Sequence, residues 1–318
     1  GVIGIAASKL VEKYGKPCIV VSASGERSVG SGRSISGFSL FDALSASSSA
    51  LVKFGGHELA AGLTVEEENI ELFRKIINEY ASKCDVPFQK LKVDCRLKPR
   101  ALTLDVAKAL KSFEPYGAGN PTPVFGIMES QLVGLQPLAN GKHVRLKLRR
   151  ENTDFGAVMF GVSPDDLPFK VGDTLDLAVT LDVNVYNNTE SVSVIVRAVR
   201  KSGLDDEALE KQLFSLDKFY CNDADKSDAE NICPTRDDIA IVFRYLRSND
   251  GVLLKRLEND LLSCLPIGKI TVSIEALCEL KLAEISEQRV KLLPFLGKTD
   301  LDSAEILKKL KSMIGGDR

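Results

Sequence analysis

The chain has 318 residues, of which 44% are hydrophobic and 27% charged, and its net charge is −2. This length predicts two or three domains. No apolar run reaches the roughly 18 residues that a membrane-spanning helix needs. The seven cysteines form no C-x-x-C pair and there are two histidines, which argues against a zinc ribbon, a disulfide framework or a His-rich metal site. We therefore expect a cytoplasmic protein with reduced thiols, no bound metal and no membrane contact.

Residues 1–83 combine helical and strand patterns and predict a small α/β domain. We expect a helix from Val2 that stops before Pro17, strands at 18–21, 28–35 and 60–65, a helix from Leu40 to near Gly55, and an amphipathic helix over 66–81.

Residues 84–122 predict a connector, with a short strand near 91–93, a helix near 103–113 and a turn-rich stretch at 114–121. From 123 to 200 the pattern changes to period two, with strands at 124–135, 144–149, 155–160, 174–185 and 191–199. Asn187-Asn188 predicts a hairpin between the last two strands. Five such strands predict an all-β barrel, for which an OB-fold is the natural candidate.

Residues 201–234 are acidic and irregular, and we expect a linker with a short helix at 205–213. Residues 235–318 show helical stretches at 237–246, 253–262 and 270–280, two short apolar runs and a final helix at 301–313. This order predicts a mostly α, winged-helix-like domain. Residues 201–318 carry 18 basic and 22 acidic side chains, which favours a protein partner over nucleic acid.

The middle of the chain is its basic part, because residues 91–200 carry 14 basic and 12 acidic side chains. Five cations fall within the nine residues 142–150, namely Lys142, Arg145, Lys147, Arg149 and Arg150. One interpretation is the solvated face of a sheet edge. The other is a nucleic-acid surface, since OB grooves pair basic residues with stacking aromatics. Aromatics are few here (Phe125, Phe155, Phe160 and Tyr186), and we expect His143 to be an ordinary exposed strand residue.

Two glycine-rich stretches carry most of the functional signal, Gly30-Ser31-Gly32-Arg33-Ser34 and the run of nine residues from Phe54 to Gly62. Glycines allow a ligand to approach the backbone closely, while the guanidinium of Arg33 and the imidazole of His57 suit a phosphate. Alternatively, Gly55 and Gly56 cap a helix, His57 is its terminal residue, and Arg33 is a solvated charge. The residues by themselves leave both interpretations open.

These two stretches resemble DHHA1 domains of the DHH phosphoesterase superfamily. Gly1–Leu10 and the segments 114–125 and 182–188 are similar to the RecJ family of single-stranded-DNA-specific 5′→3′ exonucleases, which act in DNA repair and recombination. At the hairpin, Tyr186 and Asn188 stand where the family has Trp and Gly. The resemblance implies that Arg33, Ser34, Gly55, Gly56 and His57 contact the substrate phosphate. It also implies that the OB domain holds single-stranded DNA, with Lys142, Arg145, Lys147 and Tyr186 as candidates.

The resemblance also implies that Mn²⁺ or Mg²⁺ is held by a DHH domain that carries an Asp-His-His motif. No Asp-His-His occurs in these 318 residues, and the chain does not begin with methionine. We therefore expect the sequence to continue upstream and this chain by itself to hold no catalytic residue or metal. The alternatives are a non-catalytic binding or scaffolding module, a DHHA1 phosphodiesterase of short oligonucleotides or cyclic dinucleotides, and the tRNA-synthetase branch of DHHA1 domains.

Overall fold

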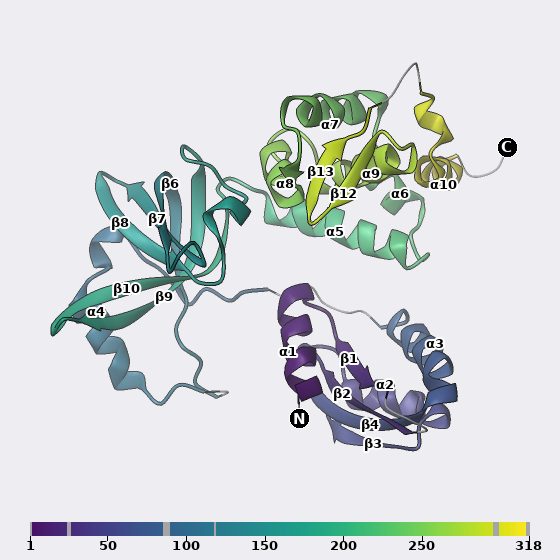
Figure 1. Cartoon of the computed structure of the whole chain (residues 1–318), viewed down its shortest axis with the longest axis horizontal. Helices are drawn as coiled ribbons and strands as arrows, with labels where there is room; N and C mark the ends of the chain where they lie inside the picture. The colour runs from purple at the N-terminus through teal and green to yellow at the C-terminus, as the bar shows by residue number, and fades with distance from the viewer. Residues whose placement is uncertain (1, 24–26, 85–89, 118, 295–298, 316–318) are drawn as a thin grey trace. The chain divides into compact units, whose positions relative to one another are not determined.

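The computed structural model describes residues 2–23, 27–84, 90–117, 119–294 and 299–315 (Figure 1). The chain divides into two compact units, residues 1–91 and residues 92–318. No helix among these described residues is long and apolar enough to cross a bilayer.

The first unit is an α/β domain built on a four-stranded antiparallel sheet of order β1-β2-β4-β3 (Figure 1). Its elements are α1 (Val2–Tyr14), β1 (Cys18–Ser22), β2 (Arg27–Arg33), α2 (Leu40–Ala46), η1 (Ser48–Ala50), β3 (Lys53–His57), β4 (Ala60–Glu66), η2 (Glu67–Asn69) and α3 (Ile70–Ala81). The α/β prediction is confirmed, but the helix expected from Leu40 to near Gly55 ends at Ala46. Gly55, Gly56 and His57 lie in strand β3, so the helix-cap interpretation is wrong.

The two faces of this sheet have different environments. One face packs Leu63, Val65 and Ala61 against Leu40 of α2 and Phe73 of α3. On the other face, α1 lies against β1 and β2. The helix approaches β2 closely, because a Cβ placed on Gly4 would lie 3.2 Å from the Ser31 hydroxyl oxygen.

The second unit begins with a five-stranded barrel (Figure 1). Its elements are β5 (Cys95–Arg96), η3 (Pro99–Ala101), α4 (Leu104–Leu110), η4 (Lys111–Phe113), β6 (Phe125–Leu138), β7 (His143–Arg150), β8 (Thr153–Met159), η5 (Pro164–Asp166), β9 (Thr174–Tyr186) and β10 (Thr189–Lys201). The strand order β6-β7-β8-β10-β9 closes through β6–β9, and β8–β10 is the parallel pair within this barrel. This is the OB-fold, as predicted from the period-two pattern.

The segment expected to be a connector belongs structurally to this barrel. Strand β5 pairs with β6, and α4 packs against β9 and β10 with Ala107 in the barrel core. The apolar face of α4 packs against the core of the barrel, so this segment is part of the barrel rather than a free connector.

The C-terminal part is mostly helical. Its elements are α5 (Asp206–Tyr220), α6 (Lys226–Ile232), α7 (Arg236–Ser248), β11 (Val252–Leu253), α8 (Leu254–Leu261), α9 (Ile267–Glu279), β12 (Ala283–Ser286), β13 (Arg289–Leu292), η6 (Leu301–Ser303) and α10 (Glu305–Ile314). The order from α7 to β13 and the sheet β11-β13-β12 are those of a winged helix. The linker expected at 201–234 is instead helical, because Leu216, Phe219 and Ile232 pack into the same core as α9.

Helix α9 is the second helix of the helix-turn-helix, the element that enters the major groove in DNA-binding members of this architecture. Here it is packed against α5, α6, α7 and α10. A Cβ on Gly268 would lie 2.5 Å from Gln212 Oε1 and 2.7 Å from Ile232 Cγ2, so α5 and α6 press onto its first turn. With these helices around it, α9 is not placed to read a DNA groove.

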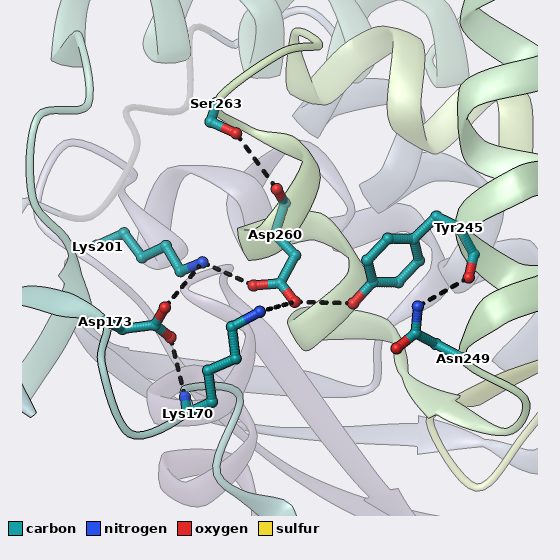
Figure 2. Close-up of polar contacts among 7 residues, drawn as sticks. All are labelled: Lys170, Asp173, Lys201, Tyr245, Asn249, Asp260 and Ser263. Atoms are coloured by element: carbon teal, nitrogen blue, oxygen red, sulfur yellow. Dashed lines mark hydrogen bonds and ion pairs between the residues drawn. The ribbon is translucent and has the colours of Figure 1, made fainter. Parts of the chain in front are cut away.

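A polar cluster joins the barrel to the winged helix (Figure 2). The Asp260 carboxylate on α8 accepts hydrogen bonds from Lys201 Nζ at 2.6 Å and from the Tyr245 hydroxyl at 2.8 Å. Lys170 Nζ donates to it at 3.3 Å. Asp173 adds an ion pair to Lys201 at 3.4 Å. Since the Asp260 side chain is only 10% exposed, these contacts are partly protected from solvent.

Two opposing effects set the pKa of the Asp260 carboxyl. Burial raises it, but the hydrogen bonds from Lys201 and Tyr245 and the charges of Lys201 and Lys170 lower it, and the net pKa lies below its ordinary value. A carboxyl whose pKa is depressed in the folded state stabilises the fold above its unfolded pKa of about 3.9. That contribution is lost as the pH falls through the folded pKa.

We predict that Asp260→Asn lowers the local free energy of unfolding of α7 and α8 by about 1–3 kcal/mol at pH 7, because it leaves Lys201 without its closest carboxylate. The difference from the wild type should begin to shrink as the pH falls below about 4, the unfolded pKa of an aspartate, and should disappear once the pH is below the depressed folded pKa of Asp260. Hydrogen–deuterium exchange of the α7 and α8 amides, begun from about pH 2 and continued to pH 8, measures both effects.

Glu284→Gln is the matched control, since Glu284 pairs with Lys291 at 2.7 Å while 42% exposed. An exposed pair of this kind contributes about 0–1 kcal/mol. Equal effects of the two substitutions, or an Asp260→Asn effect that does not depend on pH, would contradict the prediction.

Candidate nucleic-acid interface

Arg33 and His57, the two side chains expected to bind a phosphate in the first unit, lie in one row of its sheet. Ala60 of β4 pairs with Arg33 on one side and with His57 on the other. Residues directly opposite each other in antiparallel strands point to the same face, so the two side chains share a face. Two strand spacings separate their backbones, about 10 Å. Register therefore brings together two residues that are 24 positions apart in the sequence.

Arg33 is held at the boundary between the sheet and α1. Its Nη1 donates to the Gly32 carbonyl oxygen at 2.8 Å and to the Ser31 hydroxyl at 3.4 Å. A Cβ on Gly4 of α1 would lie 3.4 Å from Arg33 Nη2. The described residues include no ion-pair partner for this guanidinium, so most of its donors remain available to an anion.

His57 is exposed beside the tight turn that joins β3 to β4. Its Nδ1 accepts a hydrogen bond from the Leu59 backbone N–H at 3.3 Å. In the neutral imidazole the proton is then on Nε2, which is free to donate to a phosphate oxygen.

The same turn is anchored to two other elements. Leu59 O accepts from the Ser34 N–H and Glu58 O accepts from the Leu40 N–H, each at 2.9 Å. Ser34 contributes more to this framework than to a ligand, because its hydroxyl donates to Phe38 O at 2.7 Å. With its one proton engaged, the hydroxyl has none for a phosphate. A phosphate contact by Ser34 stays a prediction, and its backbone N–H is also occupied.

The glycines of the motif fall into two groups. Gly56 has φ +149°, and a Cβ there would lie 2.3 Å from Ala60 O, so the hairpin requires glycine at this position. Gly55 and Gly62 pair with each other on the face that carries His57. A Cβ on Gly55 would meet nothing within 4 Å, and one on Gly62 would meet a single backbone oxygen at 3.9 Å. Packing does not require these two glycines, and they leave bare backbone beside Arg33 and His57. Gly62 was not among the expected site residues.

The predicted basic strand is β7, where Val144, Leu146 and Leu148 are fully buried and the alternating cations point outward. Arg149 is engaged by Asp154 through two hydrogen bonds of 2.6 and 2.9 Å. The structure describes no ion pair for Arg145 or Lys147. These two cations therefore remain available on the outer face of the second barrel strand, which in OB-folds belongs to the oligonucleotide-binding face.

The remaining OB candidates lie on loops. Lys142 is exposed in the turn between β6 and β7, after three residues with positive φ. Tyr186 is 71% exposed at the tip of the β9–β10 hairpin, where Asn187 and Asn188 have φ of 48° and 58°. The hairpin prediction is confirmed. OB-folds bind ligands with the second and third barrel strands and with the loops at these two positions.

The described part of the chain contains no cluster of three His, Cys, Asp or Glu side chains able to hold a metal ion. Among the neighbouring acidic residues, Asp165 and Asp166 lie in the first turn of η5, and Asp238 forms a capping box with Thr235. Two-metal phosphodiester hydrolysis needs a cluster of metal ligands, and the described residues do not fit this requirement.

Comparison with known proteins agrees with this domain order. The DHHA1 domain family matches residues 1–83, and the RecJ OB domain family matches residues 93–198. A DHHA1 domain followed by a RecJ OB domain is the domain order that defines the class of this chain. Within that class, this chain belongs to the RecJ family.

The relatives are considerably longer than this chain. The single-stranded-DNA-specific exonuclease RecJ of Bacillus subtilis is 30% identical over 224 residues, which are 68% of this chain and 27% of that protein. The Escherichia coli protein of the same name is 30% identical over 62% of this chain and 35% of its own length. The crystal structure of RecJ with Mg²⁺ from Thermus thermophilus superimposes with a TM-score of 0.53 at 26% identity, over 64% of this chain and 31% of that one.

We predict that Gly56→Ala and Gly62→Ala have opposite effects. Gly56→Ala should lower the free energy of unfolding by roughly 2–3 kcal/mol, because alanine strains a positive φ and contacts Ala60 O. Gly62→Ala should leave it unchanged or raise it by up to about 1 kcal/mol, since its Cβ enters open space. Urea unfolding followed by circular dichroism measures both.

For Gly62→Ala, the effect on binding of a single-stranded oligonucleotide should differ from the effect on stability. Gly62→Ala should weaken binding while the fold is intact, because the added methyl group stands on the surface that a ligand would approach. A stable Gly62→Ala protein that binds as tightly as the wild type would show that the bare backbone is not a contact surface.

Proposed function

We propose that this chain is the substrate-binding part of a RecJ-like 5′→3′ single-stranded-DNA exonuclease and that it grips the sugar–phosphate backbone. The observation that carries the proposal is the single row Arg33–Ala60–His57 beside the open Gly55–Gly62 pair. A guanidinium offers paired donors to phosphate oxygens, and an imidazole Nε2–H offers one more. The bare backbone of Gly55 and Gly62 beside this row allows a strand to approach closely.

The OB barrel is proposed to hold the strand further along its length. Lys142, Arg145 and Lys147 supply positive charge, and Tyr186 supplies an exposed ring at the tip of the β9–β10 hairpin. Cations of this kind bind any sequence, because they contact phosphates rather than base edges. This fits the sequence-independent binding that an exonuclease needs.

Hydrolysis is proposed to require Mn²⁺ or Mg²⁺ ligands that are not among the described residues. The chain by itself should therefore bind DNA without cleaving it. Incubation of the 318-residue chain with a 5′-labelled oligonucleotide and Mn²⁺ tests this division. Release of nucleotides with turnover would contradict it.

The binding proposal is tested by fluorescence anisotropy with a 5′-phosphorylated dT oligonucleotide. Arg33→Ala combined with His57→Ala should weaken binding by roughly 10- to 100-fold at low salt, because two phosphate contacts are lost. The slope of log K against log salt should also become shallower.

Arg74→Ala is the matched control, because Arg74 is a cation of the same domain that pairs with Glu71 on α3 while 65% exposed. It should leave binding unchanged. If the Arg33 and His57 double variant binds as the wild type does, the sheet is not a phosphate site and a scaffolding role is favoured.

A further inference from the structure

The outer face of strands β7 and β8 carries an exposed aromatic residue that the predicted site did not include. Phe160 directly follows β8 and is 56% exposed. Continuing the β7–β8 register beyond Val144–Met159 places it opposite His143. The two rings are in contact, with centroids 5.1 Å apart and an interplanar angle of 77°.

A hydrogen bond holds the imidazole of His143, the ring that Phe160 contacts. His143 Nδ1 accepts a hydrogen bond from the Gly161 backbone N–H at 2.9 Å. Gly161 has φ +74°, a conformation that glycine adopts readily, so the turn after β8 directs its N–H at the ring. An edge-to-face contact with a fixed ring limits the orientations open to Phe160. A ring held in this way loses little entropy when a ligand stacks on it.

The cations follow this ring on the same face. His143, Arg145 and Lys147 alternate with buried residues along β7, so their side chains all point outward. Opposite them on β8 lie Phe160, Val158 and Gly156. Successive outward residues advance by about 6.8 Å along a strand. This face therefore carries the Phe160 ring beside the start of β7, and Arg145 and Lys147 follow it along the strand.

The long cationic side chains lie along the sheet. A Cβ on Gly134 would lie 3.4 Å from Lys147 Cδ, and one on Gly156 would lie 3.5 Å from Arg145 Cδ. The aliphatic stems thus lie over the two glycines, and the side chains of Arg145 and Lys147 are exposed to solvent, where a polyanion can reach them.

We propose that Phe160 is a base-stacking subsite and that His143 is its positioning residue. The ligand is a nucleobase of a single strand whose following phosphates meet Arg145 and Lys147. This inference rests on the proposed function and adds to it a contact with the bases. An apolar ring next to a row of available cations suits a ligand that alternates flat apolar rings with negative charges.

The test compares two oligonucleotides of equal length, one of dT and one of abasic residues with the same phosphates, by anisotropy with the full chain. Phe160→Ala should weaken binding of the dT strand roughly 5- to 150-fold, the range for loss of one base stack. It should leave binding of the abasic strand and its salt slope unchanged. Phe160→Trp should retain or strengthen dT binding.

Phe113→Ala is the matched control, because Phe113 is a comparably exposed phenylalanine (62%) on η4. It should change neither affinity. For the positioning role, His143→Ala should weaken dT binding less than Phe160→Ala does. The variant with both substitutions should bind no more weakly than Phe160→Ala alone.

The outcomes separate the two proposals. Equal effects of Phe160→Ala on both strands, or none on dT, overturn the stacking subsite while salt-dependent binding by the wild type keeps the proposed function intact. A further loss in the variant with both substitutions overturns the positioning role of His143. A wild-type chain that binds neither strand overturns the proposed function and the stacking subsite together.

Discussion

The candidate phosphate site depends on the register of one hairpin. Side chains alternate between the two faces of a strand, so a one-residue slip of β3 against β4 would turn His57 toward the apolar face that packs on Leu40 and Phe73. Several contacts fix the register. The turn at Glu58 and Leu59 is bonded to Leu40 and Ser34, and Gly56 adopts a positive φ that most residues avoid. The framework that holds this turn is therefore as important to the site as the two cations.

In the second unit, side chains alternate between the two faces of the strands in the same way, here in a closed barrel. The barrel also contacts the winged helix. In the barrel, burial of Val144, Leu146 and Leu148 forces the cations of β7 outward. The C-terminal part, by contrast, packs α9 among its other helices and contacts the barrel through Asp260. Two of the three donors to this carboxylate, Lys170 and Lys201, come from the barrel, and the third, Tyr245, comes from α7 of the winged helix itself. Asp260 is thus satisfied from both sides of the contact between the barrel and the winged helix.

The sequence predicted those parts of the fold whose signal is local. Alternation marked β7, Asn187-Asn188 marked a hairpin, and helical periodicity marked most of the C-terminal helices. Strand β3 was not predicted, because it is exposed along nearly its whole length and contains two glycines. Its sequence therefore shows no alternation of apolar and polar residues. The sequence predicted the first part of α5, at 205–213, but neither its second half nor α6, because this region is rich in acidic residues. One of these residues, Asp228, is buried and bonded to Ser215 and Lys218. The pairing of Arg33 with His57 through Ala60 depends on strand order, which no local pattern encodes.

Under the proposed function, the DHHA1 sheet and the OB barrel each suit a different chemical feature of single-stranded DNA. The DHHA1 sheet offers one guanidinium, one imidazole and bare backbone, a set suited to a single phosphate held at close range. The barrel offers cations and exposed rings spread along two strands, which suits length rather than a single group. An exonuclease that degrades many nucleotides without reading sequence needs both properties. Contacts far from the scissile bond can supply binding energy that positions the substrate for hydrolysis. Contacts of this kind use guanidinium, imidazole and ammonium donors and need no metal of their own.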